Sequence, residues 1–224
     1  MPNARPFLRA IRRFACLLAW LPLAATAADG AAEYALDPVH TRVMFAVDHA
    51  GFSKAIGTVS GSTGTLVFDP ADWRSARVDV SVPLERLDLG DAEWNRAVLA
   101  RTLLDAARHP DARFVSTHIE PVDDRHATIH GTLTLRGVSR EVTLDATFNA
   151  ARRHPLPPFR RTVGFSATAR ISRADFGVTA WKSVIGDEVE LRIEAEAVRS
   201  GKAGDAHADN ADATPAMPAT EIPR

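Results

Sequence analysis

The sequence predicts an all-β protein, an eight-stranded antiparallel barrel with one short helix. Three observations lead to this fold class. Apolar and polar residues alternate with period two over eight short stretches, as expected for strands with one buried and one solvated face. Turn-forming Gly, Pro, Asn and Asp residues separate these stretches. A single stretch has the three- and four-residue spacing of a helix. Eight strands that each need cover on one face can obtain it by closing into a barrel.

The clearest alternation lies in residues 129–148, which have the pattern of a β-hairpin. Leu133 and Leu135 share one face of its first arm, and Val142 and Leu144 share one face of its second arm. Gly137 stands at the turn between the arms, where a tight connection needs a positive φ. Because a lone hairpin is only marginally stable in water, the other strands must cover its apolar face.

The remaining elements follow in chain order. The expected strands are residues 34–49, 58–68, 76–84, 112–120, 126–135, 141–148, 161–171 and 188–198. Asp91 is the expected N-cap of a helix that includes Trp94, Leu103 and Leu104, and Pro110 marks a point it cannot pass. The proline-rich residues 151–160 are expected to form a loop.

The two ends of the chain differ in composition from its middle. Residues 1–27 have the character of a secretory signal peptide, with an arginine-rich start, a short apolar core and the small-residue end Ala25-Thr26-Ala27. Cleavage after Ala27 would leave a soluble, periplasmic protein. Residues 200–224 are rich in Ala, Asp and Pro without any aromatic residue, which predicts disorder. The folded domain is therefore expected within residues 33–199.

Charge and cysteine content exclude several functions. Cys16 is the only cysteine and lies in the predicted signal, so the mature chain has no thiol for disulfides, nucleophilic catalysis or zinc binding. Four arginines leave with the signal, so 23 Lys and Arg stand against 28 Asp and Glu, a net charge of 23 − 28 = −5. Without a basic block the sequence gives no sign of nucleic-acid binding. The apolar run of the signal is too short to span a bilayer comfortably, so no stable membrane insertion is expected.

A series of short motifs resembles one known family. In chain order they are Tyr34-x-Leu-Asp-Pro-x-His40, Phe45-x-Val-x-His49, Gly64-x-Leu-x-Phe-Asp69, His109-Pro110, Phe114-x-Ser116, Gly131-x-Leu-Thr-Leu-x-Gly-Val138, Arg173-x-Asp-Phe-Gly177 and Gly186-Asp187. Together they resemble the bacterial lipid- or polyisoprenoid-binding family called YceI-like. The resemblance implies a periplasmic, lipocalin-like barrel that holds a polyisoprenoid, a quinone or a fatty-acid derivative. One departure is that Leu103 and Leu104 stand where the family usually has two phenylalanines.

The sequence predicts no catalytic residue, no metal site and no cofactor. His40 and His49 are nine residues apart on one expected strand, so they should face opposite sides. The four histidines at positions 109, 118, 126 and 130 show no helical i,i+4 pairing, since His126 and His130 lie on one expected strand, and they have no cysteine partner. There is no G-x-S-x-G nucleophile motif. Gly57, Gly61 and Gly64 lack the following helix of a phosphate-binding loop.

The expected binding site is the barrel interior. Its predicted ligand-binding residues are Val43, Phe45, Val47, His49, Val80, Leu99, Leu103, Phe114, Leu133, Phe148, Phe165, Phe176 and Trp181. Small residues such as Ala46, Ala167 and Gly131 are expected to leave space among them. Trp94 and Trp181 are candidates for stacking on a ligand, although an aromatic residue on an apolar face more often belongs to a core.

These observations favour a periplasmic carrier, not an enzyme, with a long-chain apolar ligand as its partner. Two alternatives stay open. The first is an enzyme that acts on a lipid in the cavity, for which His49 is the candidate residue. The second is an extracytoplasmic interaction domain whose barrel is packed solid with side chains and binds no ligand. A homodimer is compatible with the sequence.

Overall fold

The computed structural model describes residues 30–201. Its strands are β1 (Ala32–Leu36), β2 (Arg42–His49), β3 (Ser53–Ser60), β4 (Thr63–Phe68), β5 (Arg77–Pro83), β6 (Leu87–Asp88), β7 (Asp111–Pro121), β8 (His126–Leu135), β9 (Val138–Arg153), β10 (Arg161–Ser172) and β11 (Ile185–Arg199). The helix α1 spans Ala92–Leu99, and the 3₁₀ turns are η1 (Trp73–Ser75), η2 (Leu84–Arg86) and η3 (Arg173–Phe176). The predicted signal peptide and nearly all of the predicted disordered tail lie outside the described residues.

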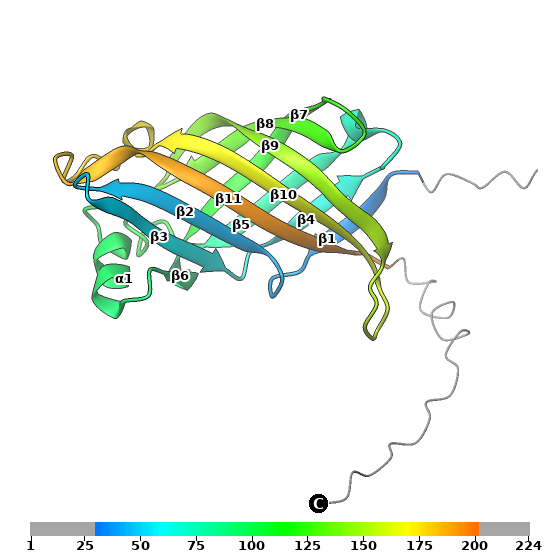
Figure 1. Cartoon of the computed structure of the whole chain (residues 1–224), viewed down its shortest axis with the longest axis horizontal. Helices are drawn as coiled ribbons and strands as arrows, with labels where there is room; N and C mark the ends of the chain where they lie inside the picture. Colours follow the sequence, from blue (N-terminus) through cyan, green and yellow to red (C-terminus); the bar gives the residue numbers. More distant parts are fainter. Residues whose placement is uncertain (1–29, 202–224) are drawn as a thin grey trace, which may run out of the picture.

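The strands form one closed antiparallel barrel (Figure 1). Neighbours follow the order β1, β4, β5, β7, β8, β9, β10 and β11, and β11 then pairs with β1 to complete the circle. β2 also pairs with β11, beyond β1, and β3 pairs with β2. The chain from β1 to β2 therefore forms one long broken strand of the wall, and the chain from β3 to β4 forms another. The predicted fold class, an eight-stranded antiparallel barrel with one short helix, is confirmed.

The predicted strand 34–49 is interrupted at residues 37–41. Asp37 Oδ1 accepts hydrogen bonds from the backbone N–H groups of Val39 and His40 at 2.8 and 3.2 Å, and the Asp37 carbonyl accepts one from Thr41. This local turn takes the backbone groups that a continuous strand would have paired with its neighbours. The predicted strand 58–68 begins earlier, at Ser53, and is interrupted at Gly61, whose φ of +77° leaves the strand region.

The helix is shorter than the spacing of apolar residues predicts. Asp91 is its N-cap as predicted, and its side chain accepts hydrogen bonds from the N–H groups of Glu93 and Trp94, both at 2.9 Å. The helix ends after Leu99, and Leu103 and Leu104 lie in the turns that follow. The apolar spacing continues because these turns, like the helix, pack against the barrel interior.

The hairpin predicted in residues 129–148 is formed by β8 and β9. Leu135 and Val138 are paired at its end, and the two residues between them, Arg136 and Gly137, have φ values of +53° and +75°. Two positive φ values are the signature of the type I′ turn, whose twist matches that of the strands. The predicted role of Gly137 is confirmed. β9 continues to Arg153, so the predicted loop 151–160 begins three residues later than expected.

One end of the barrel is filled by aromatic rings. Phe68 contacts Trp73, Phe148 and Phe165, with ring centroids 5.4, 5.4 and 5.1 Å apart. Buried Val163 and other apolar residues of β1, β4, β7 and β11 complete this cluster. We call the four aromatic residues Phe68, Trp73, Phe148 and Phe165 the aromatic plug, because they close that end of the interior. Within residues 30–201 no helix has the length and apolar character needed to cross a membrane.

Candidate functional site: an apolar cavity in the barrel

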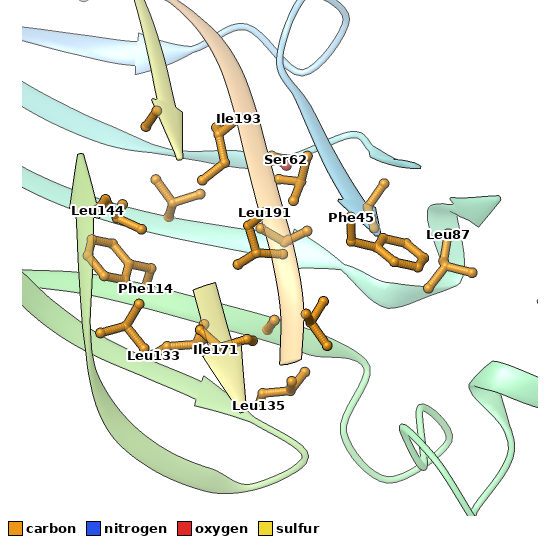
Figure 2. A pocket seen from close by; sticks show the side chains of 18 of the residues that line it. Phe45, Ser62, Leu87, Phe114, Leu133, Leu135, Leu144, Ile171, Leu191 and Ile193 are labelled. Atoms are coloured by element: carbon orange, nitrogen blue, oxygen red, sulfur yellow. The ribbon is translucent and has the colours of Figure 1, made fainter. Parts of the chain in front are cut away.

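A cavity of about 540 Å³ lies inside the barrel (Figure 2). Its wall is formed by inward-facing residues of the strands, such as Phe45 of β2 and Leu191 of β11, together with residues of α1 and the following turns. The lining residues of polar type are Thr41, Asp48, His49, Ser62, Arg173 and Glu196; every other lining residue is Ala, Val, Leu, Ile, Phe or Trp. The cavity therefore favours an apolar ligand over water.

The cavity has a floor and a mouth. Phe68, Trp73 and Phe165 of the aromatic plug line its floor. The mouth is marked by lining residues that are also open to solvent, notably Trp181 and Trp94, which are 55% and 46% exposed. These residues belong to the β10–β11 connection and to α1, which lie with the β2–β3 turn at one end of the barrel (Figure 1).

His49 lies at this mouth, half-buried beside Trp94, with the two ring centroids 5.6 Å apart. An aromatic residue on an apolar face usually belongs to a closed core. Trp94 and Trp181 do not, because both are exposed to solvent. Both are placed where an entering molecule would meet them first.

The structure brings most of the predicted ligand-binding residues together. The ones that line the cavity are Val43, Phe45, Val47, His49, Val80, Leu103, Phe114, Leu133, Phe165 and Trp181. Leu99, Phe148 and Phe176 do not line it. Phe148 lies behind the floor in the aromatic plug, Phe176 is buried in a separate cluster with Phe114 and Leu144, and Leu99 is the last residue of the short helix.

The small residues named from the sequence open less space than expected. The ring of Phe114 lies on Gly131, where a Cβ atom would come within 2.4 Å of it. The ring of Phe45 lies on Gly57 in the same way, at 2.3 Å. Each phenylalanine thus covers a glycine of a neighbouring strand and lies flat along the wall. Of the small residues predicted to leave space, Ala167 lines the cavity and Ala46 does not, because it shares the outer face of β2 with Met44.

Arg173 stabilises the β10–β11 connection at the mouth. It is buried, and its guanidinium donates hydrogen bonds to the carbonyls of Val178, Ala180, Ile185 and Gly186 at 2.7 to 2.9 Å. The four acceptors all belong to the β10–β11 connection or the start of β11, so a single side chain fixes the path of this segment. The connection carries Trp181, whose φ of +53° is unfavourable for a residue with a Cβ. The Trp181 carbonyl accepts hydrogen bonds from the N–H groups of Val184 and Ile185 at 2.9 and 2.8 Å.

Asp187 adds a second brace. Its carboxylate accepts hydrogen bonds from the Ser172 hydroxyl at 2.6 Å and from the Ala174 N–H at 3.0 Å. The hydrogen bond from Ser172 is the largest influence that holds the pKa of Asp187 below its usual range, and the positive charge of Arg173 acts in the same direction.

Two hydroxyl groups stand out in the otherwise apolar lining. Ser62, between β3 and β4, is among the lining side chains in Figure 2 and is fully buried, and its Oγ has no hydrogen-bond partner among residues 30–201. Thr41, between β1 and β2, is almost as buried but is satisfied by the backbone of Glu196. Both lie at the interruptions of the long strands, midway between floor and mouth. Sequence analysis missed Ser62 because a strand that continued through it would have given its hydroxyl no special position.

Metal-ligand spacing occurs away from this cavity. Within residues 30–201 the one cluster of suitable side chains is His118, Glu120 and His130, on β7 and β8. None of the three lines the cavity. His40, which the sequence placed on the first strand, lies in the turn before β2 and is paired with Asp37 at 2.8 Å.

The comparisons with known proteins agree with this geometry. The family profile described as YceI-like domain matches residues 34–197, which is nearly the whole barrel. The chain belongs to the YceI-like domain family. Sequence relatives include a UPF0312 protein of Pseudomonas savastanoi pv. phaseolicola, 33% identical over 66% of this chain and 77% of the relative. Another is a UPF0312 protein of Pseudomonas putida, 30% identical over 84% of this chain and 97% of the relative.

Solved structures with the same fold include proteins from two further bacteria. The crystal structure of Burkholderia cenocepacia BcnA matches with a TM-score of 0.64 and 25% identity, over 72% of this chain and 98% of that chain. The YceI protein of Campylobacter jejuni matches with a TM-score of 0.60 and 25% identity, over 67% and 88% of the two chains. A polyisoprenoid binding domain from Saccharophagus degradans shares the fold, with a TM-score of 0.52 and 16% identity over 75% and 98%.

Proposed function

We propose that this protein is a periplasmic carrier that encloses the apolar chain of a polyisoprenoid or a related lipid, such as a quinone or a fatty-acid derivative. The observation that carries the proposal is the 540 Å³ cavity with its almost wholly apolar lining. Its size is within the range of about 300–1,000 Å³ that is typical of small-molecule sites. The polyisoprenoid binding domain with the same fold supports the choice of ligand class.

The energetics favour a long apolar chain. Each buried CH₂ group contributes about 0.8 kcal/mol, so a five-carbon isoprene unit contributes about 4 kcal/mol before the entropy costs of binding. Micromolar affinity needs about 8 kcal/mol in total, so a few buried units suffice. An empty cavity, in contrast, leaves the lining atoms without partners for dispersion contacts on one side.

The chain would enter with its tail toward the aromatic plug and leave its head group at the mouth, near His49 and the connection held by Arg173. This orientation follows from the distribution of polarity. The floor is made of aromatic rings, while two of the polar lining residues, His49 and Arg173, belong to the segments that form the mouth.

The proposal predicts that the protein is purified with lipid inside the barrel. Organic extraction of gently purified protein followed by mass spectrometry should yield one dominant long-chain species at about one per barrel. A cavity-filling variant, Ala167→Phe, is the matched control and should carry less of the same species. If extracts of the native protein contain nothing beyond a denatured control, and added prenyl lipids do not change the melting temperature, the carrier proposal fails.

The compartment is tested separately. Cleavage after Ala27 and export to the periplasm are expected from the signal-like sequence at the start of the chain. N-terminal sequencing of the exported protein checks the cleavage site. A mature protein that begins before Cys16, or that stays in the membrane fraction, would contradict this expectation.

The rival functions make different predictions. An enzyme that acts on a lipid would show turnover that requires His49, so loss of product formation in His49→Ala with lipid binding intact would favour it. The carrier instead returns its ligand unchanged. A ligand-free interaction domain needs no space inside its barrel, so the cavity of about 540 Å³ supports the carrier over this alternative.

A further inference from the structure

The outer face of β7 and β8 carries three side chains with the composition of a metal site. Nitrogen atoms of His118 and His130 and a carboxylate oxygen of Glu120 all lie within 4.8 Å of one another. Nε2 of His118 is 3.4 Å from Glu120 Oε1, and Nε2 of His130 is 3.8 Å from Glu120 Oε2. The Glu120 carboxylate therefore lies close to the Nε2 atoms of both histidines.

A β-bulge creates this cluster. The pairing of β7 with β8 shifts between Ser116 and His118, so Thr117 is an extra residue opposite β8. Before the shift Phe114 and Ser116 face inward, and after it Ile119 does. His118 and Glu120 consequently face outward and His118 lies opposite His130. Without the bulge His118 would have continued the inward series of Phe114 and Ser116.

The other ring nitrogen of each histidine is held by a threonine. Thr117 Oγ1 donates to the carbonyl of His130 at 3.2 Å and lies 3.4 Å from His118 Nδ1. Nδ1 of His130 is 3.3 Å from Thr143 Oγ1 on β9. Such outer hydrogen bonds to Nδ1 are the usual support of a histidine that binds metal through Nε2.

The remaining nitrogen of His130 is in an unusual state. His130 Nε2 is shielded from solvent and has no hydrogen-bond partner within the described residues. The two rings are stacked, with centroids 4.2 Å apart and an angle of 8° between their planes. Because the two rings lie in nearly parallel planes, both must turn for their nitrogen atoms to converge on one ion. His118 and Glu120 are free to adjust, since their side chains are 56% and 60% exposed.

We propose that His118, Glu120 and His130 form a binding site for a divalent transition-metal ion, with Zn²⁺ as the first candidate. Imidazole and carboxylate are ligands that Zn²⁺ accepts, and three protein ligands leave its fourth position for water. The ion would join β7 to β8 on the outside of the wall. Ile119, between two of the ligands, packs inward in the cluster that contains the aromatic plug, so the ion would brace the closed end of the barrel.

Calorimetric titration of Zn²⁺ into the untagged, chelator-treated full-length mature protein tests the site. We expect one Zn²⁺ per chain and a rise in the thermal unfolding midpoint. His118→Ala and His130→Ala should each abolish binding at concentrations that saturate the native protein. Thr143→Val keeps all three ligands and should weaken binding about 10- to 100-fold. His126→Ala is the matched control, because His126 lies on the same hairpin but pairs with Asp123.

NMR of the imidazole nitrogens gives an independent measurement that does not depend on any variant. Addition of Zn²⁺ should shift the Nε2 resonances of His118 and His130 and leave those of His40 and His126 unchanged. The proposal is overturned if no saturable binding occurs, if the double variant His118→Ala/His130→Ala binds Zn²⁺ as tightly as the native protein, or if only other histidines respond.

Discussion

The two ends of the barrel use aromatic residues in opposite ways. At the closed end Phe68, Trp73, Phe148 and Phe165 turn toward one another, and their ring contacts fill the interior. In the other half Phe45 and Phe114 lie flat on glycines of neighbouring strands. Trp94 and Trp181 stand at the rim.

This difference explains how one continuous apolar surface can hold both a solid core and a cavity. The residues are similar in kind at both ends, so hydrophobicity alone does not decide which end is hollow. The decisive factor is whether the large side chains point across the barrel or lie along its wall. A glycine beneath a ring removes a Cβ atom and lets the ring lie close to the backbone, which keeps the middle of the barrel open.

The largest expected effect concerns the closed end. Phe68→Ala removes the ring that contacts the three other aromatic residues of the plug, and it should lower the free energy of unfolding by about 3–5 kcal/mol. Chemical denaturation measures this loss. Phe52→Ala is the matched control, because Phe52 is 92% exposed and its change should stay within about 0.5 kcal/mol. Similar losses for the two variants would contradict the distinction between a packed and an open end.

At the cavity wall we expect a smaller loss of stability and a larger loss of ligand. One side of the Phe45 ring faces the cavity and makes no packing contacts there. Phe45→Ala should therefore lower the free energy of unfolding by less than a fully packed phenylalanine would, for which the loss is about 3–5 kcal/mol. Its lipid content after purification should fall. Arg42→Ala, on the outer face of the same strand, should change neither quantity. Equal effects of the two substitutions would mean that the strand faces are assigned incorrectly.

The buried hydroxyl of Ser62 should give a smaller effect of opposite sign. A buried polar group without a hydrogen bond costs about 1–3 kcal/mol, so Ser62→Ala should stabilise the lipid-free protein by about 1 kcal/mol. Chemical denaturation of delipidated protein checks the sign. Ser53→Ala, at an exposed position on the same wall, should be neutral. A destabilised Ser62→Ala variant would show that the hydroxyl has a partner in solution.

The smallest effect concerns acid. The pKa of Asp187 is lowered in the folded protein, so the brace it provides is present above the pKa of an unfolded aspartate and is lost as the pH falls through the lower, folded value. Amide hydrogen exchange should therefore show that the Ala174 N–H loses protection in acid before the backbone N–H groups of the aromatic-plug residues do. Asp187→Asn keeps an acceptor oxygen without the titration and should remove this pH dependence. Simultaneous loss of protection at both ends would refute a local brace.

Local chemistry in the sequence determined the elements of this fold. Period-two alternation predicted the strands, the pair Arg136-Gly137 occupies the predicted turn, and Asp91 caps the helix as expected. The faces of β2 also follow directly, because a regular strand places Val43, Phe45, Val47 and His49 on one side. These features depend on residues close together in the chain, and for that reason they can be predicted without a structure.

The contents of the barrel were decided by tertiary structure. The sequence assigned Phe148 and Phe165 to the same site, yet Phe148 packs behind the floor while Phe165 lines the cavity. It counted Gly131 as open space, which the ring of Phe114 covers from a neighbouring strand. Whether a volume is filled depends on side chains that come from distant parts of the chain, and alternation carries no information about their directions.

The His118, Glu120 and His130 cluster shows the same limit most clearly. Continuous alternation along residues 112–120 puts His118 in the inward series with Phe114, so nothing in the alternation pairs it with an outward His130. The bulge at Thr117 reverses the faces of every later residue of β7. A bulge places two residues of one strand opposite one residue of its partner, so it is defined only for a pair of strands. The alternation within residues 112–120 cannot locate it before β7 is paired with β8. The sequence alone therefore determined the strands of this protein, while their pairing decided which side chains meet.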